Sequence, residues 1–111
     1  MNGLIAKTKL FDTAIASGAF LLSSDITPTE GRSALRITVA FDTATKLKIS
    51  YDDGVTTLLM TMNNDTDLAA SNIYTFTVGC DSTLGVNFQH TDAGSINCDL
   101  LIVSEVMGGV L

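Results

Sequence analysis

Few residues in this chain of 111 have side chains that could catalyse a reaction or hold zinc. His90 is the single histidine, so a Ser/His/Asp or Cys/His arrangement would have to use it, and no Gly-x-Ser-x-Gly turn is present to aim a serine. Because His90 alternates with Val86 and Phe88, a strand position is the favoured interpretation. Zinc needs three or four Cys or His ligands, and Cys80, Cys98 and His90 lack Cys-x-x-Cys spacing. The sequence therefore predicts no enzyme, no catalytic residue, no cofactor and no metal site.

The loop from Asn63 to Asp67 is the one place where calcium binding has to be weighed against an ordinary turn. It places several oxygen donors together, and Asp52 and Asp53 would join them if both turns lay at one end of the fold. Asn and Asp are also favoured in turns because their side chains bond the local backbone. No bidentate Glu or twelve-residue loop completes a calcium pattern, so the turn interpretation is favoured and calcium is the alternative.

The two cysteines, Cys80 and Cys98, each fall in a strand-like run of residues. One disulfide between them is the alternative in an oxidising compartment, and buried free thiols are the favoured interpretation.

Charge is unevenly distributed along the chain. All six basic residues lie in the first 48 positions, and residues 49–111 contain no Lys or Arg. Phosphate neutralisation needs a basic stripe, so nucleic acid is not expected as a partner. Either the charges interleave once the strands mix, or the molecule is two-faced and its acidic side meets a basic neighbour.

Membrane insertion is not expected either. The apolar stretch at residues 14–22 is much shorter than the roughly 20 residues that a spanning helix needs. Lys7, Lys9 and Asp12 lie where a signal peptide would be apolar, so we expect synthesis in a cytoplasm and no membrane partner.

Alternating apolar and polar residues predict β-strands along almost the whole chain. The candidates are 35–41, 47–51, 56–62, 74–78, 86–90 and 96–106, with weaker ones at 4–11 and 19–24. Asp52-Asp53-Gly54 predicts a tight turn, Thr43-Ala44-Thr45 suits a hairpin link, and residues 68–72 suit a short helical turn or a loop. About eight short strands predict a single all-β domain over residues 1–111, an antiparallel β-sandwich or jelly roll.

The end of the chain indicates a possible subunit contact. The strand 96–106 is apolar on both faces in its middle, which predicts a central strand or one covered by a partner. The segment after it is either a frayed terminus or a docking segment. In the second case Val106, Met107, Val110 and Leu111 form the interface, and the two glycines between them let the chain bend. Only 16% of residues are charged, which also favours a subunit covered by neighbours.

Three stretches of the chain resemble small virion structural proteins of tailed bacteriophages. In that group a loop similar to L-x-A-x-x-x-Y-x-F feeds a strand, and an N-F-Q strand precedes a terminal hydrophobic one. The corresponding residues here are Leu68 to Val78, Val86 to Gln89 and Ile96 to Val106, and Leu10 to Ile37 has a similar character. The resemblance covers most of the chain, although the acidic second half and the apolar tail depart from it.

The resemblance implies a capsid decoration protein, or a tail, baseplate or fibre component, located in the virion. Such proteins are symmetric and often trimeric, so the expected partners are further copies of the chain, a trimer being favoured, and a major capsid protein. A carbohydrate- or polar-ligand-binding module is the alternative function. It is disfavoured because the chain has no Trp, and Tyr51 and Tyr74 are in phase with core-facing residues.

Overall fold

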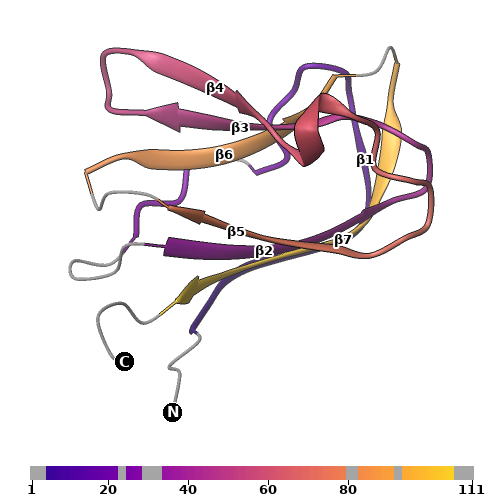
Figure 1. The fold of residues 1–111 in the computed structure, drawn as a ribbon, viewed down its shortest axis with the longest axis horizontal. Coiled ribbons are helices and arrows are strands. Elements are labelled where there is room, and N and C mark those ends of the chain that lie inside the picture. Colours follow the sequence, from indigo (N-terminus) through magenta and orange to yellow (C-terminus); the bar gives the residue numbers. More distant parts are fainter. Residues whose placement is uncertain (1–4, 23–24, 29–33, 80–82, 92–93, 107–111) are drawn as a thin grey trace.

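The computed structural model describes residues 5–22, 25–28, 34–79, 83–91 and 94–106, and these residues form an all-β fold (Figure 1). One short 3-10 helix, Asn63–Asp65, is the exception to the strands. The strands are β1 (Ile5–Ile15), β2 (Ala34–Phe41), β3 (Leu47–Asp52), β4 (Thr57–Thr61), β5 (Tyr74–Gly79), β6 (Gly85–His90) and β7 (Ile96–Val106). The prediction of an all-β fold is confirmed.

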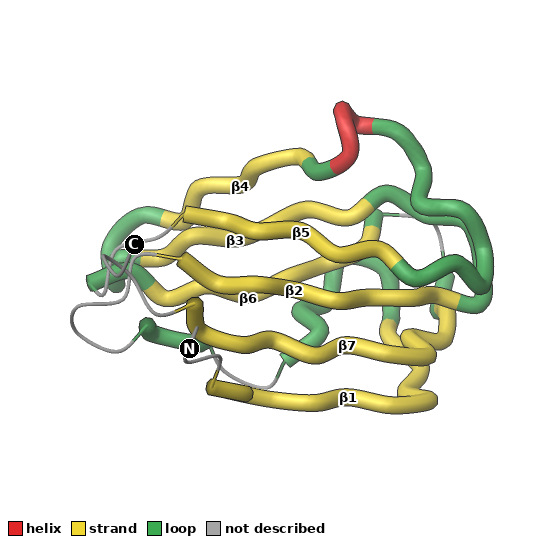
Figure 2. Tube along the Cα trace, turned by 60° about the horizontal axis from the view of Figure 1, so that its bottom comes forward, coloured by secondary structure: helices red, strands yellow, loops and turns green. Residues whose placement is uncertain are grey.

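The strands form two antiparallel sheets that pack as layers of a sandwich (Figures 1 and 2). The four-stranded sheet has the order β1-β7-β2-β5, and the three-stranded sheet has the order β4-β3-β6. β7 therefore lies between β1 and β2, and its predicted central position is confirmed.

The predicted strand at residues 19–24 is not a continuous strand in the described part of the chain. Residues within and just after this range pair with the outer edge of β6 through two isolated bridges, Phe20 to Gln89 and Ile26 to Val86. Between them the Asn87 side chain bonds Leu22, with its Oδ1 accepting from the Leu22 N–H at 3.2 Å. A side chain thus replaces part of the backbone ladder, which is why the period-two pattern did not become a regular strand.

The pairing of elements is that of a jelly roll. The first strand, β1, pairs with the last, β7, and the bridged segment after β1 pairs with β6. β2 then pairs with β5, and β3 pairs with β4. The chain is thus a long antiparallel ribbon folded back on itself and rolled into two layers, as in eight-stranded jelly rolls.

Apolar side chains from both sheets fill the space between the layers. Fully buried members are Leu35, Ile37, Val39, Ile49, Val86, Phe88, Leu101 and Val103. They come from positions two apart on their strands, because successive side chains of a strand point to opposite faces. This core holds the surface elements in place.

The link at Thr43-Ala44-Thr45 is not a hairpin. β2 and β3 belong to different sheets, so this link crosses from one layer to the other, and Thr45 forms a bridge with Leu68. Both strands present alternating apolar residues to the same core, and a sequence pattern does not distinguish strands that pair from strands that face each other across a core. Residues 68–72 form a loop, which is one of the two predicted alternatives, with a turn in which the Asn72 N–H donates to the Ala69 carbonyl at 3.3 Å. A short 3-10 turn forms earlier, at Asn63–Asp65. No helix in the described ranges has the length and apolar character to cross a membrane.

Candidate functional site

His90 lies on β6, as predicted, and is completely buried. Its Nε2 is 2.7 Å from the carbonyl oxygen of Ile15, and its ring meets Phe41 edge-on. In this position the side chain packs in the core and contacts the end of β1.

Cys98 is a buried free thiol. Burial raises its pKa to about 11, while a weak bond from Sγ to the carbonyl oxygen of Leu100, 3.5 Å long, acts in the opposite direction. The thiol is therefore protonated at neutral pH and is a poor nucleophile. Cys80 lies outside the described residues, so the state of its own thiol stays a prediction.

The Asn63 to Asp67 loop is a left-handed turn held by its own side chains. Asn63, Asn64 and Asp65 have φ of 55°, 55° and 58°, a conformation that Asn and Asp tolerate best among residues with a side chain. The Asn63 Nδ2 donates to the Thr66 Oγ1 at 3.0 Å and to the Asp67 carbonyl at 3.3 Å. These contacts give the oxygen-rich residues a turn-forming role, as the favoured interpretation predicts.

Asp52 and Asp53 are at the opposite end of the β3–β4 hairpin from this loop, so they do not meet the condition under which they would join a calcium site there. Asp52 pairs with Thr57 at one end of β4, whereas Met62, next to the loop, bonds Leu47 at the other. Within the described ranges, no three His, Cys, Asp or Glu side chains group as metal ligands.

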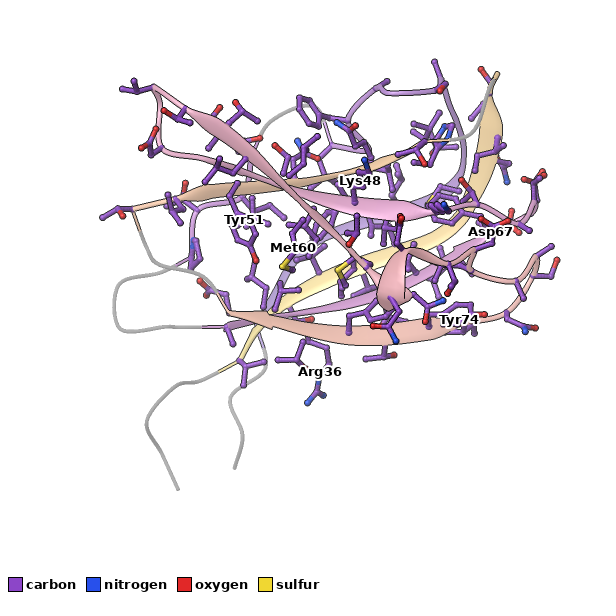
Figure 3. The ribbon with its side chains drawn as sticks, turned by 45° about the horizontal axis from the view of Figure 1, so that its top comes forward. Arg36, Lys48, Tyr51, Met60, Asp67 and Tyr74 are labelled. Carbon is purple, nitrogen blue, oxygen red and sulfur yellow. The ribbon has the colours of Figure 1, made fainter. Side chains whose placement is uncertain are left out.

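Both tyrosines pack against the core, in agreement with their phase in the sequence. The Tyr51 hydroxyl donates to the Gly79 carbonyl at 3.1 Å, and the Tyr74 hydroxyl accepts from the Ala69 N–H at 2.9 Å. Tyr74 also stacks on Phe76 with ring centroids 6.2 Å apart. The Tyr51 bond joins β3 of one sheet to β5 of the other, and the Tyr74 bond ties the loop at Ala69 to β5; both tyrosines are labelled in Figure 3.

Charges of the two halves of the chain meet in the fold. The Lys46 Nζ lies 3.8 Å from the Asp65 carboxylate, and Glu105 is buried rather than displayed on the surface. Arg36 is exposed and points away from the sandwich (Figure 3). The Lys46–Asp65 pair supports interleaved charges over a strictly two-faced surface.

Of the predicted interface residues, the structure describes only Val106. It is the last residue of β7, is half-buried and pairs with Ala34 of β2. Met107, Val110 and Leu111 lie outside the described residues. On the outward side of β7, Leu100 and Ile102 are also half-buried, and Ser104, which pairs with the exposed Arg36, separates them from Val106.

The most prominent surface feature is β4 together with the turn before it, which we call the β4 edge (residues 55–61). All five residues of β4 are exposed, and no charged residue interrupts them. Of the six large apolar side chains that are exposed among the described residues, four belong to this edge: Val55 (92% exposed), Leu58 (64%), Leu59 (52%) and Met60 (41%). Contiguous exposed apolar side chains are typical of sites that bind another protein.

The exposure follows from the unequal width of the two sheets. β4 lies at one edge of its sheet, and Figure 2 shows it beyond β5, the last strand of the opposite sheet. Leu58 and Met60 pair with Tyr51 and Ile49 and so point toward the other layer, but no strand of that layer covers them. Met60 is labelled on this side in Figure 3.

Sequence reasoning found the strand but missed its exposure. Leu58-Leu59-Met60 is apolar without alternation, the same signal that predicted a central or partner-covered position for residues 96–106. Applied to residues 56–62, that argument would have singled out this strand too. A comparison of the sequence with models of known protein families and with curated proteins finds no match.

Proposed function

We propose that this protein is a non-enzymatic structural subunit of a virus particle, of the capsid decoration type expected from its resemblance to tailed-bacteriophage proteins. Its partners are further copies of itself, with a trimer favoured, and a major capsid protein. Jelly rolls recur in viral capsid domains and also in lectins and cupins, so the fold supports the proposal as an analogy only.

The observation that carries the proposal is the β4 edge. A monomer that works alone gains nothing from leaving Leu58, Leu59 and Met60 exposed, whereas a subunit buries them on assembly. Burial stabilises a contact by about 25 cal/mol for each Å² of apolar surface removed from water. When many copies assemble on one particle, their individually weak contacts act together, so each subunit is held more tightly than one contact would hold it.

A second contact at the chain end is part of the proposal. Leu100, Ile102 and Val106 are half-buried on the outward face of the wider sheet, with Ser104 between the last two. The predicted interface at Val106, Met107, Val110 and Leu111 would dock by insertion of the chain end into a neighbour.

Two measurements test the proposed function. Mass spectrometry of purified virus particles from cells that make the protein should detect it in a fixed ratio to the major capsid protein, with an abundant host protein as the contamination control. Light scattering should give a multiple of the 11.7 kDa chain mass, and ending the chain at Val106 should weaken that oligomer. Absence from particles together with a monomeric, truncation-insensitive mass would refute the proposal.

A further inference from the structure

The backbone groups that β4 presents to solvent can be assigned from its pairing with β3. The Met62 N–H donates to Leu47 O at 3.1 Å and the Asp53 N–H to Thr56 O at 3.4 Å, so these two pairs are hydrogen-bonded pairs of the antiparallel ladder. Hydrogen-bonded and non-hydrogen-bonded pairs alternate along such a ladder. Leu58 and Met60 therefore direct their N–H and C=O groups toward β3.

The same alternation leaves Thr57, Leu59 and Thr61 directing their N–H and C=O groups away from β3, toward the free edge. Among the described residues none bonds these groups. The register of β3 with β4 is regular, without the bulge that interrupts the pairing of β1 with β7. β4 also lacks the charged residues and proline that usually protect an edge strand from pairing with another chain.

The side chains of β4 read almost the same in both directions: Thr57-Leu58-Leu59-Met60-Thr61. In antiparallel pairing about a two-fold axis at Leu59, Leu59 faces its own copy, Leu58 faces Met60, and Thr57 faces Thr61. A two-fold contact must be self-complementary in this way, because each residue meets the same patch of the partner.

The hydrogen-bond directions are compatible with this register, and the overlap of the two strands selects it. An axis at Leu59 makes hydrogen-bonded pairs of Leu59 with Leu59 and of Thr57 with Thr61, which are the residues whose backbone groups point outward. Any axis through a residue of β4 opposes outward-directed groups to one another, whereas an axis between two residues would oppose them to groups directed toward β3. Among the axes through a residue, the one at Leu59 pairs all five residues of β4, and every other one shortens the overlap.

The apolar side chains gain contacts on both faces in this arrangement. Leu58 and Met60 lie on the side of Ile49 and Tyr51 and would meet Met60 and Leu58 of the second copy. Leu59 lies on the opposite side, with Ser50, and would meet its own equivalent. No charge lies within the paired strands, so no like charges are brought together.

The free edge of β5 fits a second copy less well. On β5 the exposed side chains are Thr75 and Thr77, while Tyr74 and Phe76 are already half-buried against the core. Pairing there would remove little additional apolar surface from water, so the gain from burial favours β4.

We infer that β4 pairs antiparallel with β4 of a second copy about a two-fold axis at Leu59, joining two three-stranded sheets into one sheet of six strands. This inference rests on the proposed function in that it names one partner of the β4 edge, a second copy of the chain. It adds a two-fold contact to whatever oligomer the chain end forms.

Single cysteines at exposed positions test the register, in a Cys80→Ser background that keeps the buried Cys98. Leu59→Cys should cross-link to itself under mild oxidation, because Cα atoms of a hydrogen-bonded pair are about 5.5 Å apart, within disulfide range. Leu58→Cys alone should not, because its two copies would be about 8 Å apart, beyond that range. A mixture of Leu58→Cys with Met60→Cys should cross-link, because these positions are directly opposed.

A charge on the axis tests the contact in solution. Leu59→Lys places two ammonium groups opposite each other and should halve the mass measured by light scattering, whether the starting species is a dimer or a larger even oligomer. Ile73→Lys is the matched control, since Ile73 is also a strongly exposed apolar residue (67%) but lies outside the β4 edge. It should leave the mass unchanged, and circular dichroism should show that both variants are folded.

The outcomes separate this inference from the proposed function. A particle-bound protein whose Leu59→Cys variant does not cross-link, and whose mass is unaffected by Leu59→Lys, overturns the β4 pairing and leaves the structural role intact. The predicted cross-links in a protein that is absent from particles establish the pairing and overturn the virion role. Self-cross-linking of Leu58→Cys instead of Leu59→Cys overturns the register.

Discussion

The two edges of the three-stranded sheet are treated in opposite ways. At β6 the chain covers its own edge, since the Gly18 N–H bonds His90 O, the Leu21 N–H bonds Phe88 O, and Ile26 pairs with Val86. At β4 none of the described residues pairs with the outer edge, and every residue of the strand is exposed. The comparison shows that an edge strand of this sheet is buried only where another segment of the chain packs against it. The uncovered strand is where another subunit has most to gain.

Phe88 and Met60 provide the sharpest comparison of the two edges, because both pair with Ile49 on the same face of the sheet. Phe88 is fully buried and Met60 is 41% exposed. We expect Phe88→Ala to lower the free energy of unfolding by about 3–5 kcal/mol, as for buried aromatic residues generally, and Met60→Ala to cost less than about 1 kcal/mol in the monomer. Urea denaturation monitored by circular dichroism measures both, and equal losses would mean that β4 is as well packed as β6.

Asn87 tests how the segment that covers the edge of β6, from Gly18 to Ile26 in its described part, is attached to that strand. Its Oδ1 accepts from the N–H groups of Leu22 and Phe88, and its Nδ2 donates to Leu22 O and to Asp25. Asn87→Ala leaves several buried groups without partners, so we expect it to cost about 2–3 kcal/mol in the same denaturation experiment. Gln89→Ala, at the half-buried neighbouring position, is the control and should cost under about 1 kcal/mol. If Asn87→Ala also costs under about 1 kcal/mol, the backbone contacts alone are sufficient to hold the covering segment on β6.

Gly85 tests how closely the cover approaches β6. A Cβ at Gly85 would lie 2.7 Å from the Asp25 Cβ. Overpacking of this kind typically costs 1–3 kcal/mol, and we expect Gly85→Ala to fall at about 1–2 kcal/mol. Adding Asp25→Gly removes the clashing atom, so the double variant should recover part of the loss. No recovery would mean that the cost arises elsewhere.

The smallest expected effect is at the turn that leads into β4. The Asp53 carboxylate accepts from the N–H groups of Thr56 and Val55, each at 2.8 Å, and these bonds lower its pKa below the ordinary 3.8. A lowered pKa in the folded state stabilises the turn above pH 3.8, and this contribution is lost as the pH falls through the folded value. Hydrogen exchange of the β4 amides, corrected for the intrinsic pH dependence, should accelerate in acid relative to the β6 amides. An equal response of both strands would refute a local effect.

Much of the fold follows from local patterns. The alternation of Leu35, Ile37 and Val39 predicts β2, and Asp52-Asp53-Gly54 predicts the turn before β4, where Gly54 has φ of +90°. The irregular cover on β6 was predicted as a strand, because nothing in residues 19–24 shows that the Asn87 side chain, distant in the sequence, would take the place of backbone partners. The sequence pattern predicts the strand at residues 56–62, but it does not predict that the apolar side chains of β4 are exposed.

The sequence by itself determined the all-β class, the positions of the seven strands, the inward and outward faces of those that alternate, and the turn residues between them, because these depend on neighbours within a few positions. Only the tertiary structure decided that β2 and β3 lie in different layers, that His90 is fully buried, and that β4 extends beyond the sheet opposite. These outcomes depend on contacts between residues far apart in the chain. An alternating pattern says which side of a strand is apolar, but the width of the opposite sheet decides whether that side is covered.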